Sequence, residues 1–194
     1  MKIILASKSG VRKQILEKYG ITPKVVISNV DEDQIKESLL SEKVDPLNIS
    51  KNLAELKSVK VSSKFPDQLV LGADSVISLN DELINKPRSR DEAFQILSKL
   101  NNSIHFLISS VCISKNGAMI WNYTDKSELK MKKLSDNELK LYLQEIKTEI
   151  LLAYGVYQIE AGGLNLFEYI KGDKDSIMGL PIKQIKEYIS NYKL

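Results

Sequence analysis

The stretch LVLGADSVISLN, residues 69–80, is the strongest strand signal in the chain. Its apolar run is nearly continuous, which is typical of a central strand covered on both faces. Asp74 interrupts this run, and a buried carboxylate is costly without a partner. We therefore expect a strong partner for Asp74, which can be a metal ion, a lysine or a cluster of hydrogen-bond donors. Gly72, two residues earlier on the same face, leaves room for something to approach.

The segments on either side of this strand predict a mixed α/β fold with a curved mixed sheet flanked by helices. Further strands are expected over 2–6, 23–28, 104–114, 118–131 and 164–170. Helices are expected over 10–20, after the acidic loop 29–37, from Pro46 to just before Pro66, from about Asp91, over 136–146 and in the C-terminal segment 175–192. A chain of 194 residues can bury a core of its own, so we expect one domain over residues 1–194.

The composition excludes several classes of protein. A formal charge of +3, from 28 basic and 25 acidic residues, is too small to indicate nucleic acid binding. One cysteine, Cys112, excludes an internal disulfide framework. It lies in an apolar run and is expected in a strand core, which disfavours a nucleophilic pair with His105. The sequence shows neither a transmembrane segment nor a signal peptide, so we expect a cytoplasmic protein.

The turn LASKSG, residues 5–10, joins the first expected strand to the first expected helix. Unpaired backbone N–H groups at a helix start favour anions. Ser7 and Ser9 add hydroxyl groups, and Arg12 and Lys13 add positive charge within one turn. The turn thus indicates a phosphate site, although a capped helix with solvated charges explains it about as well. It is not a P-loop, because the glycine and lysine spacing of that motif is absent.

Three other stretches carry weaker signals. Carboxylates in VDED, residues 30–33, could hold Mg²⁺, although a solvated acidic loop is the commoner explanation. Lys57 and Lys86 resemble ordinary surface lysines, but with Arg12 and Asp74 they would surround a triphosphate. Glu160 precedes a glycine-rich turn and could accept two N–H bonds from a nucleobase, although an exposed turn residue is the usual case.

Taken in order, these pieces resemble the Maf-like nucleoside triphosphate pyrophosphatases, also called septum formation inhibitor-like proteins. The resemblance runs nearly end to end. The matching segments are LASKSGVRKQIL, GADSV, Lys86-Pro87, LNNSIH and IKGDKDSIMGLP. Their common order and spacing make the match specific.

The resemblance implies a fold with two lobes around an active-site cleft and a metal-dependent hydrolysis of nucleoside triphosphate to monophosphate and pyrophosphate. It implies Mg²⁺ or Mn²⁺ held by Asp74 and Glu32, and removal of non-standard or modified nucleotides from the pool. The catalytic residues it implies are Asp74, Glu32, Lys57 and Lys86. The substrate-binding residues it implies are Ser7, Ser9, Arg12, Lys13, Ser75 and Glu160.

The sequence departs from the family at the positions that separate its subgroups. Gly10 and Val11 replace a proline and an arginine of the entry motif, and Ser75 replaces a threonine. The three specificity positions are Val11, Ser75 and Glu160. Val11 and Glu160 resemble the subgroup that acts on 7-methyl-GTP, whereas Ser75 fits neither subgroup.

Two other functions stay open at this point. A nucleotide-binding regulator of cell division with weak catalysis would keep the same binding residues, although the presence of both Asp74 and Glu32 favours an enzyme. A nucleic-acid-binding protein would need a basic stripe with interleaved aromatic residues, which the chain lacks. The apolar IWNY, residues 120–123, and the C-terminal helix leave a homodimer open.

Overall fold

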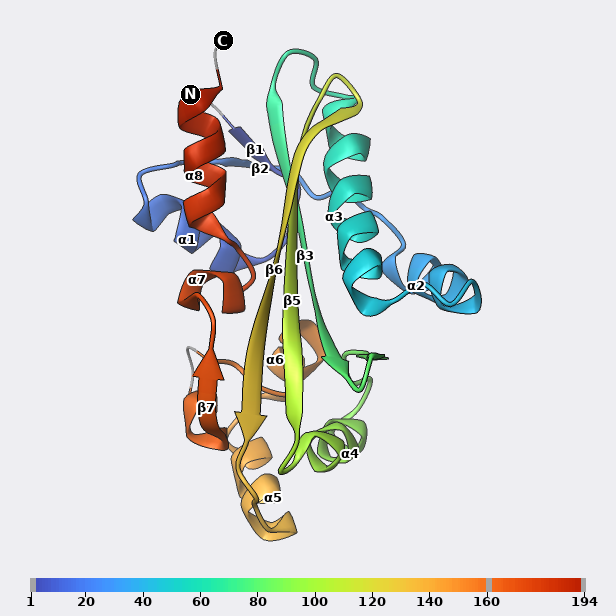
Figure 1. Ribbon diagram of the computed structural model, residues 1–194, viewed down its shortest axis with the longest axis vertical. Helices are drawn as coiled ribbons and strands as arrows, with labels where there is room; N and C mark the ends of the chain where they lie inside the picture. Colours follow the sequence, from blue (N-terminus) through green and yellow to red (C-terminus); the bar gives the residue numbers. More distant parts are fainter. Residues whose placement is uncertain (1–2, 160–161, 193–194) are drawn as a thin grey trace. The chain divides into compact units, whose positions relative to one another are not determined.

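The computed structural model describes residues 3–159 and 162–192 and has a mixed sheet with helices packed against it (Figure 1). The strands are β1 (Ile3–Leu5), β2 (Lys24–Val25), β3 (Leu69–Leu79), β4 (Glu82–Ile84), β5 (Ile104–Lys115), β6 (Ala118–Met131) and β7 (Phe167–Lys171). The helices are α1 (Gly10–Lys18), α2 (Glu32–Ser41), α3 (Pro46–Ser62), α4 (Arg90–Leu100), α5 (Asp136–Gln144), α6 (Thr148–Tyr154), α7 (Lys174–Ile177) and α8 (Ile182–Asn191), with a 3-10 turn η1 (Gly163–Leu166). The predicted mixed α/β class is confirmed. Within the described residues, no helix is long and apolar enough to span a membrane.

The sheet has the strand order β2-β1-β3-β5-β6-β7, with β4 paired to β3. Strand β1 runs parallel to both β2 and β3, while β4 is antiparallel to β3 and β7 is antiparallel to β6. The chain divides into two compact units. The first comprises Met1–Val76, Ile108–Lys126 and Asp173–Leu194, and the second comprises Ile77–Leu107 and Ser127–Gly172.

Strand β3 lies inside the sheet and is covered on both faces in the first unit, as its apolar run predicts. Alternate residues of a strand point to opposite faces. Leu71 therefore packs with α1 and α8, in a core cluster that includes Ile15 and Ile185. Val70 packs on the other face with Val61 of α3. This alternation places one set of helices on each side of the strand that contains Asp74.

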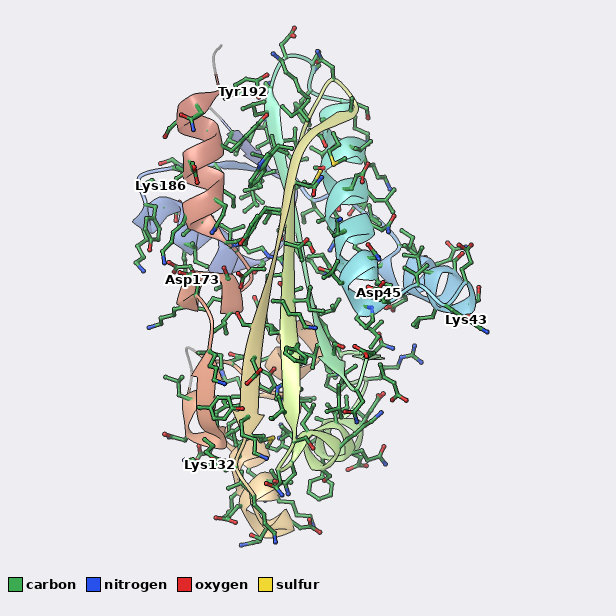
Figure 2. All side chains as sticks on the ribbon, in the orientation of Figure 1. Lys43, Asp45, Lys132, Asp173, Lys186 and Tyr192 are labelled. Carbon is green, nitrogen blue, oxygen red and sulfur yellow. The ribbon has the colours of Figure 1, made fainter. Side chains whose placement is uncertain are left out.

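Gly72 is the point at which α3 comes closest to the sheet. A Cβ atom at this position would lie 2.2 Å from the Ala54 carbonyl oxygen and 2.7 Å from the Ser58 amide nitrogen. The space that the sequence assigns to an approaching group is therefore filled by the helix backbone. Asp45 caps the start of α3 by accepting from the Asn48 amide at 2.9 Å (Figure 2).

The second unit is held by a buried aromatic cluster and by one arginine. His105 is fully buried, and its Nε2 atom lies 3.0 Å from the Tyr157 hydroxyl. The Tyr157 ring meets Phe167 edge-on, with centroids 5.0 Å apart. Arg90 of α4 donates to the Ile146 carbonyl at 2.8 Å and to the Thr148 hydroxyl at 2.8 Å. These contacts tie α4 to the segment between α5 and α6.

Several expected elements differ from those observed. The strand expected over 23–28 contains only the two residues of β2, and the strand expected over 164–170 begins at Phe167 after η1. Helix α6 was not expected. Its N-terminus has no side-chain cap, so it lacks the local signal by which a helix is recognised in a sequence. A distant residue, Arg90, contacts the start of the helix by donating to the Thr148 hydroxyl.

Candidate active site

Asp74 lies on the α3 face of β3 and is held there by α3. Its side chain is 6% exposed, and its Oδ1 atom accepts a hydrogen bond from Nζ of Lys57 at 2.8 Å. Ser50, two turns before Lys57 on the same face of α3, donates to the Asp74 carbonyl oxygen at 3.3 Å. Of the three partners considered from sequence, the described residues provide the lysine.

Glu32 is brought to the same lysine by the start of α2. Asp31 caps this helix by accepting from the Gln34 amide at 3.1 Å, which places Glu32 in the first turn. The Oε1 atom of Glu32 lies 2.9 Å from Nζ of Lys57. Glu32 is thus a helix residue rather than a residue of a solvated loop. One buried ammonium group joins two carboxylates that are 42 positions apart in the sequence.

Arg12 approaches β3 from the opposite face, where α1 and α8 pack. Its Nη1 atom donates to the Ala73 carbonyl at 2.9 Å and to the Ser7 hydroxyl at 3.1 Å. Its Nε atom donates to the Gly179 carbonyl at 3.0 Å, and Nη2 lies 3.2 Å from the Ser75 hydroxyl. These four bonds connect the entry turn, β3 and the turn before α8.

The charge of Arg12 is coupled to the two carboxylates. Burial lowers the pKa of the Arg12 guanidinium below its ordinary value, while the negative charges of Asp74 and Glu32 act in the opposite direction. The guanidinium therefore shares an electrostatic environment with the carboxylates. Two cations and two anions balance one another in this part of the first unit.

The entry turn has the geometry of a capped helix start. Ser9 caps α1 by accepting from the Arg12 amide at 3.5 Å, and its own amide donates to Ser7 Oγ at 3.2 Å. Ser7 accepts both the bond from the Ser9 amide and the bond from Arg12, so its hydroxyl hydrogen is not used in them. Lys13 is exposed and forms a 3.4 Å ion pair with Glu17 along the helix. The structure thus brings Ser7, Ser9 and Arg12 together and leaves Lys13 on the surface.

Three predicted residues remain. Val11 packs against the core beneath α1 and α8. Lys86 belongs to the second unit, where its Nζ atom donates to the Ala153 carbonyl at 2.8 Å. Glu160 lies outside the described residues.

A family model described as Maf-like protein matches residues 2–192. The chain belongs to the Maf-like protein family. A nucleoside triphosphate pyrophosphatase from Pelagibacter ubique is 60% identical to it over 99% of this chain and 98% of its own length. A 7-methyl-GTP pyrophosphatase from Bartonella quintana is 39% identical over 93% of this chain and 90% of its own. A solved HAM1 protein from Coxiella burnetii covers 68% of this chain and 73% of its own, with 13% identity and a TM-score of 0.46, a similarity too low to support a conclusion.

This Maf-like protein has two carboxylates suited to a divalent cation. Among the described residues, no group of three or more His, Cys, Asp or Glu side chains could enclose a metal ion. Mg²⁺ is commonly held by one or two carboxylates together with water and substrate phosphates. The Oδ2 atom of Asp74 is buried and has no hydrogen-bond partner in the described structure. This oxygen is free to coordinate a metal ion, and the carboxylate of Glu32 contacts the same lysine, so the two residues fit such a cation.

Sequence reasoning missed the residues that hold Arg12 in place. The Gly179 carbonyl accepts from Arg12, and Ser109 of β5 lies 3.0 Å from the Ser75 hydroxyl. The glycine of the family's Gly-Leu-Pro pattern was a signal for the first of these, since Gly179 has a φ of +98°. Tyr19 holds the same C-terminal turn by donating to Asp175 at 2.6 Å. No local pattern marks Ser109 or Asp175.

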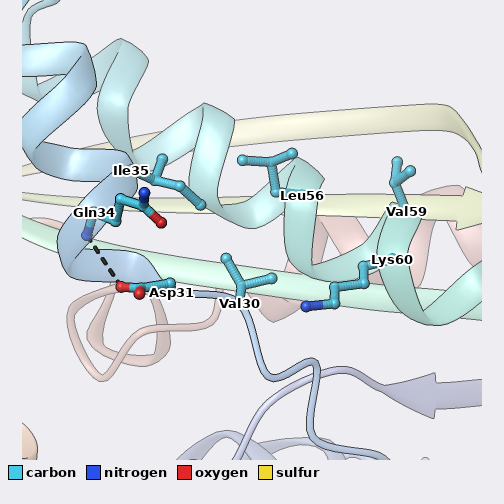
Figure 3. Close-up of a pocket in the computed structure, with 7 residues that line it drawn as sticks. All are labelled: Val30, Asp31, Gln34, Ile35, Leu56, Val59 and Lys60. Carbon is cyan, nitrogen blue, oxygen red and sulfur yellow. Dashed lines mark hydrogen bonds between the residues drawn. The ribbon is translucent and has the colours of Figure 1, made fainter.

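A surface pocket and the buried Cys112 are separate from the cluster of Glu32, Lys57, Asp74 and Arg12. A surface pocket lies between α2 and α3 (Figure 3), and it is lined by Val30, Asp31, Gln34, Ile35, Leu56, Val59 and Lys60. None of these seven is a residue of the Glu32, Lys57, Asp74 and Arg12 cluster. Cys112 is buried in β5, as predicted, and burial raises the pKa of its thiol. A buried thiol with a raised pKa is a poor nucleophile.

Proposed function

We propose that this chain is a divalent-metal-dependent nucleoside triphosphate pyrophosphatase that releases a nucleoside monophosphate and pyrophosphate. The prediction that it is an enzyme of the hydrolase class is supported by the relative that is 60% identical over 99% of this chain. The single structural observation behind the proposed reaction is the cluster in which the buried Lys57 and Asp74 meet the partly exposed Glu32. A carboxylate buried in the middle of a central strand and paired with a buried lysine is an arrangement typical of functional sites, although structural ion pairs can also take this form.

The chain's own residues account for the steps of this hydrolysis. A water molecule attacks the α-phosphorus, its proton passes to the carboxylate of Asp74, and the bond from the α-phosphorus to the bridging oxygen breaks. Negative charge then develops on the leaving pyrophosphate. Lys57 and Arg12 supply positive charge, and Ser7 can donate its hydroxyl hydrogen to a phosphate oxygen. In this proposal Lys86 also faces the phosphates, as the family resemblance implies.

Asp74 and Glu32 would hold the divalent cation. When bound, it lowers the pKa of coordinated water and neutralises phosphate charge. Mg²⁺ and Mn²⁺ both suit oxygen ligands of this kind. In this proposal Asp74 both accepts the proton and binds the metal, while Glu32 binds the metal, as the family resemblance implies.

The substrate in this proposal is a non-standard or modified nucleotide. Support comes from the Bartonella quintana relative, which is named for 7-methyl-GTP, and from the specificity positions Val11 and Glu160. The Ser75 hydroxyl accepts a hydrogen bond from Arg12. In this proposal Ser75 influences substrate binding by positioning the guanidinium of Arg12. Glu160 would accept two N–H bonds from the base edge.

The test is pyrophosphate release from a panel of standard and methylated nucleoside triphosphates, with Mg²⁺, Mn²⁺ or a chelator. We expect Asp74→Asn to lower turnover by about 10²–10⁴-fold, the usual contribution of a positioned acid or base. Glu32→Gln should also lower turnover, and its matched control is Asp33→Asn, an exposed neighbour in the first turn of α2.

A folded wild-type protein that binds nucleotide but releases no pyrophosphate would contradict this function. It would favour the alternative, a nucleotide-binding regulator of cell division with weak catalysis. Near-normal turnover in Asp74→Asn would also contradict the proposal, since it would remove the aspartate from the reaction. Activity that persists in the chelator would contradict the metal requirement alone.

A further inference from the structure

We propose that the ammonium group of Lys57 stands in the place that a divalent cation takes between Glu32 and Asp74, so that Lys57 must leave when the metal binds. This inference deepens the proposed function and rests on its metal site. It assigns Lys57 a role before catalysis, as an internal competitor of the metal. The family resemblance gives this lysine only a role toward the phosphates.

The geometry of the lysine supports this role. Nζ of Lys57 lies 2.8 Å from Asp74 and 2.9 Å from Glu32. A cation that contacts both carboxylates fills the space in which a metal would contact both. The Lys57 side chain is only 7% exposed. Water can therefore take over only part of its contacts with the two carboxylates. The like charges of the two carboxylates repel one another, and a cation that contacts both offsets this repulsion.

A second observation shows that the lysine leaves the site incompletely paired. Asp74 accepts from Lys57 through Oδ1, while its Oδ2 atom is buried and unpartnered in the described structure. Buried polar atoms are normally satisfied, and an exception calls for an explanation such as an ion that binds there. A divalent ion has more charge and more coordination positions than one ammonium group. It can therefore use the oxygen that Lys57 does not reach.

Lys57 has the properties of a group that can move. It has a flexible four-carbon side chain, and its ammonium group is a point charge without a fixed geometry. Its partners are anions, and the phosphates of a nucleotide offer it equivalent partners. When Lys57 transfers to the phosphates, the carboxylates become free for the metal. Metal and triphosphate should therefore strengthen one another's binding, and this coupling is reciprocal.

The experiment measures Mn²⁺ binding by titration calorimetry to the full-length protein without nucleotide. We compare wild type, Lys57→Met and a matched control, Lys60→Met, which removes an exposed lysine from the same helix. We expect Lys57→Met to bind Mn²⁺ about tenfold more tightly than wild type or more, where tenfold corresponds to about 1.4 kcal/mol. Lys60→Met should bind as wild type does. Equal or weaker binding by Lys57→Met, or no binding by any of the three, would overturn the proposal.

A measurement on wild type covers the case in which Lys57→Met does not fold. The protein is treated with an amine-acylating reagent, with and without Mn²⁺, and the modified lysines are located by mass spectrometry. Mn²⁺ should increase acylation of Lys57 and leave Lys60 unchanged. Unchanged labelling of Lys57 in the presence of Mn²⁺ would overturn the proposal.

Pyrophosphate release, measured on the same preparations, separates this inference from the proposed function. A protein whose Mn²⁺ affinity rises in Lys57→Met but which hydrolyses no nucleotide would keep the inference and reject the reaction. An active wild type with unchanged Mn²⁺ affinity in Lys57→Met would do the reverse. Lys57→Met should also lose the coupling between Mn²⁺ and a triphosphate, which calorimetry with a slowly hydrolysed analogue measures.

Discussion

Arg12 and Lys57 approach strand β3 from opposite faces, and they are held in different ways. Arg12 donates four hydrogen bonds to backbone carbonyls and serine hydroxyls, all of them neutral groups. Lys57 is bonded to two carboxylates. The planar guanidinium fits several fixed acceptors at once. The ammonium group is a point charge on a flexible side chain, so it binds wherever negative charge is nearest.

This difference separates a cation that organises the site from one that can be exchanged. The bonds of Arg12 join three chain segments, so its removal loosens the framework. The bonds of Lys57 are to anions that a metal can take over, and the lysine can find new anions on a phosphate. The same strand thus has a fixed positive charge on one side and a replaceable one on the other. Substitutions on each side should give different kinds of effect.

The largest effect is expected on the Lys57 side, from Gly72→Ala. The new Cβ atom would lie 2.2 Å from the Ala54 carbonyl oxygen, which is backbone and cannot turn away. Overpacking of this kind costs about 3 kcal/mol or more at such a contact. With about 2–4 °C per kcal/mol for a chain of this size, thermal unfolding should begin roughly 6–12 °C earlier.

Gly10→Ala is the matched control for this change, since a Cβ atom at Gly10 meets nothing within 4 Å. It lies in α1, where alanine is favoured over glycine, so it should not destabilise the protein. Wild-type stability in Gly72→Ala would show that α3 does not press on the sheet at this point.

A smaller effect is expected on the other side, from Arg12→Lys. The substitution keeps the charge but loses the fork that reaches Ala73, Ser75 and Gly179. We expect a loss of about 2 kcal/mol in the free energy of unfolding, measured in urea, since a hydrogen bond from a charged donor contributes about 1.5–3 kcal/mol.

Lys13→Arg is the control for Arg12→Lys. Lys13 is the exposed neighbour of Arg12, and its ion pair with Glu17 is a surface pair. Such a change should alter stability by less than about 0.5 kcal/mol. If Arg12→Lys proved as stable as Lys13→Arg, the four bonds of Arg12 would not organise the framework, and the contrast with Lys57 would fail.

The two sides were not equally predictable from sequence. A carboxylate inside an apolar strand is conspicuous, and the need of Asp74 for a partner follows from its burial alone. That the partner is Lys57 depends on how α3 crosses β3, which no local pattern encodes. Gly72 was expected to leave room for something to approach, and the structure confirms this, but the sequence does not show that the approaching group is the backbone of α3.

The fold was predictable where the local signal is strong. The apolar run of β3 gave its burial and its central place, and Ser135 with Glu138 forms the capping box expected before α5. Helix α6 was missed because its start has no side-chain cap, and its contact with Arg90, through the Thr148 hydroxyl, comes from a residue more than 50 positions away. The strand expected over 23–28 was overestimated, because β2 lies at the sheet edge and Val25 and Ile27 are exposed.

The smallest expected effect comes from the buried imidazole of His105. It tests whether the acid sensitivity of the folded protein has a source other than Arg12 and Lys57. Burial lowers the pKa of His105 to about 4. The unfolded chain, with an ordinary imidazole pKa of about 6.5, then binds more protons between these values, so stability falls as the pH falls through this window. From pH 7 to 5.5 we expect a loss of about 1 kcal/mol in the free energy of unfolding. His105→Gln should lack this component while Arg12→Lys keeps it. An imidazole pKa near 6.5, measured by NMR in the folded protein, would show that protonation of His105 costs nothing and that acid sensitivity arises elsewhere.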